Sequence, residues 1–294
     1  MIEGSKNKSL SLVSKNKKEN HKDRNREKQS LCVRKTQNIS LTRVQKSYWL
    51  FGTHAVTAAL LNPRRRYTRL LVTEEKKPVL IEAKKQGIML RVAPEIVSKS
   101  RLEEYLPSEA VHQGVALKVH PLDPLTIEEA LACPGPIVVL DHVTDPRNIG
   151  AILRSTAALG GSFLIVQERH APEETAVLAK AASGALESVP IVRVVNISRA
   201  LETLQKQGCW TIGLEAQAPL LNGADFSQKR VALVLGAEGQ GLRRLVREHC
   251  DEIAGLYMPQ RRVKEGIVRM ESLNVSIAAA IGLYEVVRYG VYTR

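Results

Sequence analysis

Residues 231–244 of this 294-residue chain read VALVLGAEGQGLRR. The apolar run from Val231 to Leu235 is typical of a buried strand, and three glycines follow it within six residues. Because glycine permits a tight turn and lets a ligand approach the backbone, the stretch predicts a strand, a binding turn and a helix. The GxxGxG spacing is neither the dinucleotide GxGxxG nor a P-loop, which ends in Lys-Ser/Thr. A strand-to-helix turn that binds nothing is the alternative.

An earlier segment, residues 140–155, reads LDHVTDPRNIGAILRS and also joins a strand to a helix. Asp145 is a preferred N-cap residue, and Pro146 suits the first helical position. Arg147 and Arg154 are seven residues apart, so they share one helical face. On local sequence alone, an ordinary capped helix with solvated arginines remains the alternative.

A third segment near the end of the chain runs from Met258-Pro259 to Ser272 and on into a helix rich in small residues. Ser272 is predicted to cap this helix. Small residues let helices or backbones approach one another closely, although a terminal core helix needs no other explanation.

Strands and helices alternate regularly from residue 137 onward. The predicted strands are 137–140, 163–166, 191–195, 211–214, 231–235 and 253–257, and the predicted helices are 149–159, 173–182, 198–207, 242–249 and 273–287. This alternation predicts an α/β domain with a mostly parallel sheet covered by helices on both faces. In such a sheet, ligands bind outside the carboxyl ends of the strands, where all three segments lie.

The chain before this domain divides into three parts. We expect a basic disordered tail at 1–46, a small α/β domain at 47–119 and a linker at 120–135, followed by the large domain at 136–294. In the small domain, we predict helices at 52–61 and 79–85, and strands at 70–72, 88–92 and 115–119.

The charge is unevenly distributed along the chain. Residues 1–46 hold 13 Lys/Arg and four Asp/Glu, so +9 of the net charge of +13 lies in the tail. A segment of this composition buries too little apolar surface to fold alone. A basic tail on a nearly neutral body suggests a polyanion partner such as RNA, although solubility alone could explain it.

Several classes of protein are disfavoured. The sequence lacks the ~18 consecutive apolar residues of a membrane span, and its first residues lack the apolar run of a secretory signal. Its cysteines and histidines have no metal-ligand spacing. We therefore expect a cytoplasmic protein with no membrane association and no metal.

Taken in order, the three segments resemble the signature of the SpoU/TrmH RNA 2′-O-methyltransferases of the SPOUT superfamily. The matching stretches are 145–150 with Arg154, 235–239 with Gly241, and Met258-Pro259 with 272–276. Residues 51–119 resemble the family's small substrate-binding domain, chiefly through 52–56 and 111–115.

The resemblance implies a fold and a reaction. The large domain would fold as a deep trefoil knot. The methyl donor would be S-adenosylmethionine, and the protein would form a homodimer. The layout looks closest to bacterial enzymes that methylate a guanosine ribose of 23S ribosomal RNA. The alternatives are a transfer-RNA 2′-O-methyltransferase and a non-catalytic RNA-binding ribosome-assembly protein, whereas the glycine spacing argues against a dinucleotide-dependent oxidoreductase.

The resemblance also implies site residues, each taken from its matching motif position. The expected catalytic residues are Arg154, Asn148, Glu238, Ser272 and Asn274, and the expected cofactor-binding residues are Leu235, Gly236, Gly241, Met258 and Leu273. Relatives usually have a shorter link where this chain has residues 260–271, so the cofactor loop is longer and more basic here.

A ribose 2′-hydroxyl is a weak nucleophile that must be polarised or deprotonated and held in line with the methyl group. We expect Arg154 to be essential. A guanidinium is a poor general base, so we expect it to stabilise the developing alkoxide and to hold the adjacent phosphate. Glu238 is a rival base, or it holds its loop by hydrogen bonds.

Overall fold

The structure is a computed structural model that describes residues 47–78, 80–81, 87–259 and 272–290, and the backbone of 261–263 and 266–268. These residues all belong to one compact unit, Val44–Arg294. The predicted disordered tail, 1–46, lies outside the described residues.

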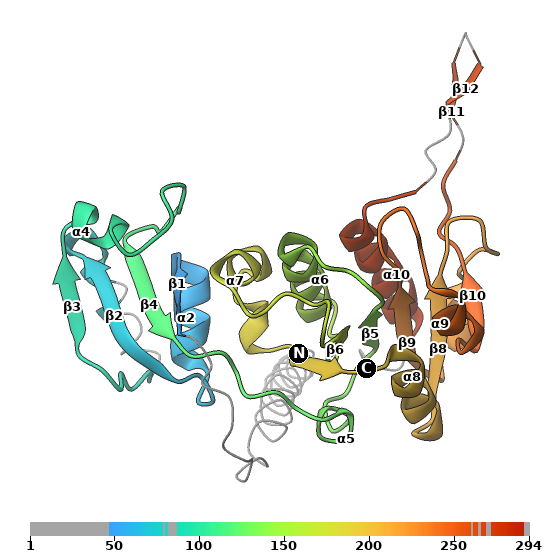
Figure 1. Cartoon of the computed structure of the whole chain (residues 1–294), viewed down its shortest axis with the longest axis horizontal. Helices are drawn as coiled ribbons and strands as arrows, with labels where there is room; N and C mark the ends of the chain where they lie inside the picture. Colours follow the sequence, from blue (N-terminus) through green and yellow to red (C-terminus); the bar gives the residue numbers. More distant parts are fainter. Residues whose placement is uncertain are drawn as a thin grey trace, which may run out of the picture. The chain divides into compact units, whose positions relative to one another are not determined.

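Residues 48–119 contribute a four-stranded sheet in the order β1-β4-β2-β3 (Figure 1). The strands are β1 (Tyr48–Phe51), β2 (Tyr67–Thr73), β3 (Pro94–Val97) and β4 (Val115–Val119). β4 pairs antiparallel with β1 and β2, whereas β3 pairs parallel with β2. One face of this sheet packs with helix α2 (Thr53–Leu61), and the other carries a separate apolar cluster with helix α4 (Lys99–Glu103).

The structure of this domain differs from the sequence-based expectation in one predicted strand and in two elements that were not expected. The strand predicted at 88–92 is wrong, because the strand is β3, which begins at Pro94. The backbone N–H of Arg91 donates to the Tyr67 hydroxyl instead of to a neighbouring strand. β1 and α4 were not predicted, and most of the helix predicted at 79–85 lies outside the described residues.

The larger sheet has six strands in the order β10-β8-β9-β5-β6-β7, and every pair of neighbours is parallel. The strands are β5 (Ile137–Leu140), β6 (Leu164–Gln167), β7 (Ile191–Val194), β8 (Cys209–Leu214), β9 (Arg230–Leu235) and β10 (Glu252–Ala254). The expected α/β class, with a parallel sheet, is confirmed. The trefoil knot stays a prediction.

Helices cover both faces of this sheet, as expected. Alternate strand residues point to opposite faces, so Val138 and Leu233 join one core cluster while Val139 and Ala232 join another. The first face is covered by α6 (Pro146–Ala158), α7 (Ala176–Ala182) and α10 (Val275–Tyr289), and the second by α5 (Ile127–Ala130), α8 (Ile197–Lys206) and α9 (Arg244–Glu248). α5 falls within the predicted linker, where Thr126 and Glu129 form a reciprocal capping box.

The strand order of the sheet changes direction between the central strands β5 and β9. From β5 the chain continues to β6 and β7 on one side, and β9, β8 and β10 lie on the other side. These strands are neighbours, with Leu140 opposite Leu235, and the N–H of Asp141 donates to the carbonyl of Leu235 at 2.8 Å. The loops that follow the two strands therefore begin side by side at the carboxyl edge. This is where open parallel sheets bind ligands.

A buried ion cluster joins the two sheets' domains. The Arg65 side chain is fully buried and forms ion pairs with Glu174 and Glu187, the latter at 2.7 Å. Arg65 belongs to the small domain, and both carboxylates belong to the segment that includes α7. Burial raises the pKa of Glu187 even though Arg65 opposes the shift. These ion pairs join the small domain to the segment that includes α7, and α7 lies beside β1 and α2 (Figure 1).

The remaining elements are short. They are the 3₁₀ turns η1 (Glu74–Lys76), η2 (Ala185–Glu187) and η3 (Gly223–Phe226), and a hairpin of β11 (Arg261–Val263) and β12 (Gly266–Val268). The hairpin lies in the loop that is predicted to be longer than in relatives. Among the described residues, no helix is long and apolar enough to cross a membrane.

Candidate active site

Helix α6 begins at the carboxyl end of β5 and places Asn148 at the edge of the sheet. The Asp145 side chain caps the helix by accepting from the N–H of Arg147 at 2.8 Å, and Pro146 occupies the first turn, as predicted. Gly150 lets α6 approach α7, because a Cβ there would lie 2.5 Å from the Ala181 Cβ. Close packing of these helices holds the first turn of α6 in place.

Three side chains from three separate segments of the chain meet at this edge. Glu238 follows β9, and its Oε1 accepts from Asn148 Nδ2 at 3.0 Å and from Asn274 Nδ2 at 2.8 Å. Asn274 Nδ2 also lies 3.1 Å from Asn148 Oδ1. We call Asn148, Glu238 and Asn274 the amide–carboxylate cluster. It unites the three segments that the sequence singled out.

The turn after β9 is compact and its backbone is accessible. A Cβ on Gly236 would lie 2.0 Å from the carbonyl carbon of Gly241, so a side chain does not fit there. The N–H of Gly241 donates to the Ala237 carbonyl at 2.9 Å, and Gly239 and Gly241 have φ values of +82° and +67°. Glycine is favoured at such positive φ values. Leu235, just before the turn, is buried and anchors it in the core.

The start of α10 differs from the sequence prediction. The cap is Asn274, whose Oδ1 accepts from the N–H of Ser276 at 2.9 Å, and the helix begins at Val275. The prediction that Ser272 caps this helix is wrong, since Ser272 lies two residues before the cap and its side chain is exposed. Asn274 therefore caps α10 with its oxygen while its nitrogen joins the amide–carboxylate cluster.

The other expected residues lie outside the cluster. Met258, which follows β10, and Leu273, which precedes α10, are half-buried apolar side chains. Arg154 lies on α6, almost two turns beyond Asn148, and is exposed. Within the part of the chain that the structure describes, the Arg154 guanidinium has no hydrogen bond or ion pair, so it is available to an anionic ligand.

An ion pair that was not predicted from the sequence joins the loop after β5 to the loop after β9. The Asp141 side chain is fully buried and accepts two hydrogen bonds from Arg243. One comes from the backbone N–H of Arg243 at 3.0 Å and the other from its Nε at 2.8 Å. This pair ties the loop after β5 to the helical end of the glycine turn. A charged residue directly after a buried strand was the available signal, but the local sequence did not name its partner.

A pair of histidines was also missed. The rings of His142 and His170 are 4.3 Å apart between centroids, and His142 has a φ of 58°. Burial, assisted by the nearby Arg243 and His170, lowers the pKa of His142, while Asp141 opposes the shift. His142 Nε2 is buried without a hydrogen-bond partner among the described residues. A neutral imidazole is favoured here.

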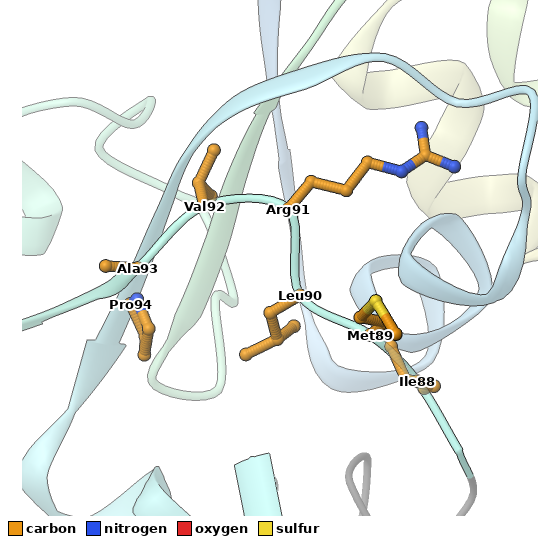
Figure 2. A pocket seen from close by; sticks show the side chains of 7 residues that line it. All are labelled: Ile88, Met89, Leu90, Arg91, Val92, Ala93 and Pro94. Carbon is orange, nitrogen blue, oxygen red and sulfur yellow. The ribbon is translucent and has the colours of Figure 1, made fainter.

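A hollow elsewhere on the surface is not the site. Figure 2 shows it lined by one continuous segment, residues 88–94, with Arg91 pointing away from Leu90. Arg91 donates to the carbonyl of Pro63 at 2.8 Å, and Met89 is 86% exposed. The hollow brings together no polar groups from different elements, unlike the carboxyl edge of the large sheet.

Comparison with known proteins identifies the arrangement. The profile of the SpoU rRNA Methylase family matches residues 135–284, which include the whole amide–carboxylate cluster. A second profile, RNA 2′-O ribose methyltransferase substrate binding, matches residues 49–125. The chain belongs to the SpoU rRNA methylase family. It is therefore an RNA ribose 2′-O-methyltransferase that uses S-adenosylmethionine.

Curated relatives within the SpoU family match over almost their whole length. The chain is 36% identical over 253 residues to the Escherichia coli K12 protein named 23S rRNA (guanosine-2′-O-)-methyltransferase RlmB. The matched region covers 82% of this chain and 98% of that protein. The RlmB of Xylella fastidiosa is 36% identical over 257 residues, covering 83% of this chain and 97% of that protein.

Solved structures of SpoU proteins share the fold. The SpoU methyltransferase AviRb from Streptomyces viridochromogenes, in complex with AdoMet, has a TM-score of 0.66 at 22% identity and covers 89% of this chain and 96% of that chain. An AdoMet-bound rRNA methyltransferase from Sinorhizobium meliloti has a TM-score of 0.64 at 21% identity, covering 82% of this chain and 87% of that chain.

The residues at the carboxyl edge suit S-adenosylmethionine. The backbone of the glycine turn is partly exposed after Leu235, and Met258 and Leu273 are half-buried apolar side chains. Carbonyl and N–H groups near such apolar surface are the usual means of holding a cofactor of this size.

Proposed function

We propose that this enzyme methylates the 2′-hydroxyl of a guanosine in 23S ribosomal RNA, in the cytoplasm. The amide–carboxylate cluster carries the proposal, because it gathers Asn148, Glu238 and Asn274 from three distant segments at the carboxyl edge. The similarity to RlmB proteins over 98% of their length supports the choice of substrate.

The cofactor residues act through position rather than charge. Leu235 anchors the glycine turn, Gly236 allows its close contact with Gly241, and Met258 and Leu273 provide apolar surface. S-adenosylmethionine supplies a methyl group already activated on a sulfonium. Binding at this edge would hold that group beside the cluster, where the ribose must reach it.

Arg154 would act on the ribose hydroxyl and its phosphate. Its guanidinium stabilises the negative charge that develops on the 2′-oxygen and binds the adjacent phosphate through its forked donors. The proton leaves to water or to an RNA phosphate. This role fits an exposed arginine that has no ion pair among the described residues.

Glu238 would position the cluster. Its Oε1 already accepts from two amides, which ties together the loop after β9, the start of α6 and the start of α10. Ser272 is exposed beside Leu273 and is free to contact RNA.

The domain boundaries and tail complete the proposal. Residues 47–119 would bind the RNA, 120–135 would connect the domains, 136–294 would carry out the transfer, and the basic tail at 1–46 would add phosphate contacts. Each neutralised phosphate makes binding more sensitive to salt.

A homodimer is supported by one face of α10. Ile277, Ile281 and Tyr284 are 51%, 44% and 56% exposed, and their spacing puts them on one side of the helix. A contiguous exposed apolar stripe of this kind marks an interface, and a second copy of the chain is the partner that the family resemblance implies. Sedimentation should give a dimer for the wild type and a monomer for Ile281→Glu. A monomeric wild type would refute this part of the proposal.

The substrate is tested by methyl transfer from labelled S-adenosylmethionine to 23S rRNA that lacks its own methylations. We expect label at one guanosine, mapped by cleavage that is blocked by ribose methylation. Label on transfer RNA and not on 23S rRNA would contradict the proposed substrate while leaving the reaction class intact. Cofactor binding without transfer to any RNA would contradict the reaction itself.

A further inference from the structure

The outer face of the four-stranded sheet carries a row of aromatic and cationic side chains. In the strand register, Trp49 of β1 lies opposite Lys118 of β4, and Lys118 lies opposite Arg69 of β2. Residues directly opposite one another project from the same face of a sheet. The row therefore crosses three adjacent strands, on the face that α2 does not cover.

Tyr105, which follows α4, extends this row. The rings of Trp49 and Tyr105 lie 5.3 Å apart between centroids at an angle of 43°. The Arg69 guanidinium is 5.7 Å from the Trp49 ring centre and 5.0 Å from that of Tyr105, and Arg101 is 5.3 Å from Tyr105. We call Trp49, Tyr105, Arg69 and Arg101 the stacked patch.

The two arginines of the patch are held by ion pairs, and the Trp49 and Tyr105 rings are half-buried. Arg69 forms a two-pronged pair with Glu95 at 2.8 and 2.7 Å, and Arg101 pairs with Glu104. The Arg69 side chain is still 35% exposed and that of Arg101 57% exposed. Glu95 and Glu104 offset the two arginines, so the patch is better suited to a flat, polarisable group than to a phosphate alone.

The face continues toward the methyltransferase domain. Phe51, two residues after Trp49 on the same face of β1, has Lys180 of α7 over its ring at 5.7 Å. Ala176 of α7 packs against the apolar cluster beneath the patch. Because α7 packs closely on α6, a strand of RNA lying on this face would lead to the helix that carries Asn148 and Arg154.

We propose that the stacked patch is a binding site for unpaired bases of the substrate RNA, an inference that rests on RNA being the substrate. Every nucleobase presents a flat π face that stacks on tyrosine, tryptophan or a guanidinium plane. Lys118 and Lys180 supply positive charge along the row for the backbone between stacked bases. The patch recognises single strands, because a continuous duplex hides the faces of its bases.

The test uses the fluorescence of Trp49 in the full chain. The sequence has two tryptophans, so Trp210→Phe leaves Trp49 as the sole reporter, and Trp49→Phe leaves Trp210 as the matched control. A single-stranded oligoribonucleotide of about 12 nucleotides, within the site sizes of single-strand-binding domains, should quench Trp49 and leave Trp210 unchanged. The blunt-ended duplex of the same sequence should quench Trp49 far less.

Substitution of Tyr105 provides a second measurement. Tyr105→Ala should raise the Kd for the single-stranded oligoribonucleotide about five- to tenfold, the effect of losing one stacked base. Tyr105→Phe should stay near the wild type, because it keeps the ring. Binding of S-adenosylmethionine should be unchanged in both variants, which shows that the methyltransferase domain is intact.

Two outcomes would overturn the inference. One is RNA binding that leaves Trp49 fluorescence unchanged, and the other is equal quenching by single strand and duplex. Either outcome together with methyl transfer to 23S rRNA would refute the patch and leave the proposed function standing. Quenching of Trp49 without any methyl transfer would refute the proposed function and leave the patch standing.

Discussion

At the scale of single residues, the site depends on the shared acceptor Glu238 Oε1. Asn148 and Asn274 each donate to this oxygen, at 3.0 and 2.8 Å. The sequence indicated all three residues through the family resemblance, but it could not show that they bond to one another. Their segments are separated by 90 and 36 residues, and the sheet order brings them together.

Glu238→Gln separates the two roles considered for this carboxylate. If Glu238 is a general base, Glu238→Gln should lower kcat by at least about 10²-fold. If Glu238 only positions the cluster, kcat should fall by less, because a glutamine Oε1 can still accept from both asparagines. Glu238→Ala should lose far more than Glu238→Gln, because it removes the acceptor. Single-turnover methyl transfer measures both. Equal losses in the two variants would contradict the positioning role.

His142 should give stability a dependence on pH. Its pKa is lowered in the folded chain, so below its ordinary value of about 6.5 the unfolded chain binds a proton that the folded chain resists. Stability should therefore fall as the pH drops through that value. His142→Asn keeps a residue that tolerates positive φ and should show a shallower fall in melting temperature between about pH 7.5 and pH 5.5. Identical slopes would show that His142 does not contribute.

At the scale of elements, the strands of the large sheet were predicted well because each is a short, continuous apolar run between helices. The predictions failed where an element lacks that pattern. Residues 88–92 have the composition of a strand, yet Arg91 bonds to Tyr67. α10 begins at Val275 because Asn274 provides a better-placed cap than Ser272. The Asp141–Arg243 ion pair depends on long-range geometry that no local pattern encodes.

The glycine turn should tolerate no side chain at position 236. The Cβ of Gly236→Ala would lie 2.0 Å from the backbone of Gly241, so the turn must open. Overpacking of this kind costs about 1–3 kcal/mol, which corresponds to roughly five- to 150-fold weaker binding of S-adenosylmethionine. Gly208→Ala, at the amino end of β8 with a φ of 79°, is the control that strains the backbone away from the site. Calorimetric titration should show weaker binding for Gly236→Ala alone, and unchanged binding would contradict the turn's assigned role.

At the scale of the whole molecule, the junction between the domains depends on Arg65. Arg65→Met would leave Glu174 and Glu187 buried without their cation, which costs about 3–5 kcal/mol in comparable sites. Arg66→Met is the matched control, because Arg66 and Asp123 are 63% and 59% exposed and such pairs contribute about 1 kcal/mol or less. Denaturant unfolding measures both variants. Equal losses would show that the buried cluster is not what fixes the junction.

The central claim is that Arg154 accelerates the methyl transfer step rather than binding of the cofactor. The most direct test is the single-turnover rate of transfer to unmethylated 23S rRNA, with Kd for S-adenosylmethionine measured alongside. We predict that Arg154→Ala loses at least about 10²-fold in rate, as when a stabilising donor is removed from an oxyanion, while the cofactor Kd is unchanged. We expect Arg154→Lys to recover only a small part of the loss. A rate near that of the wild type in Arg154→Ala would contradict the account.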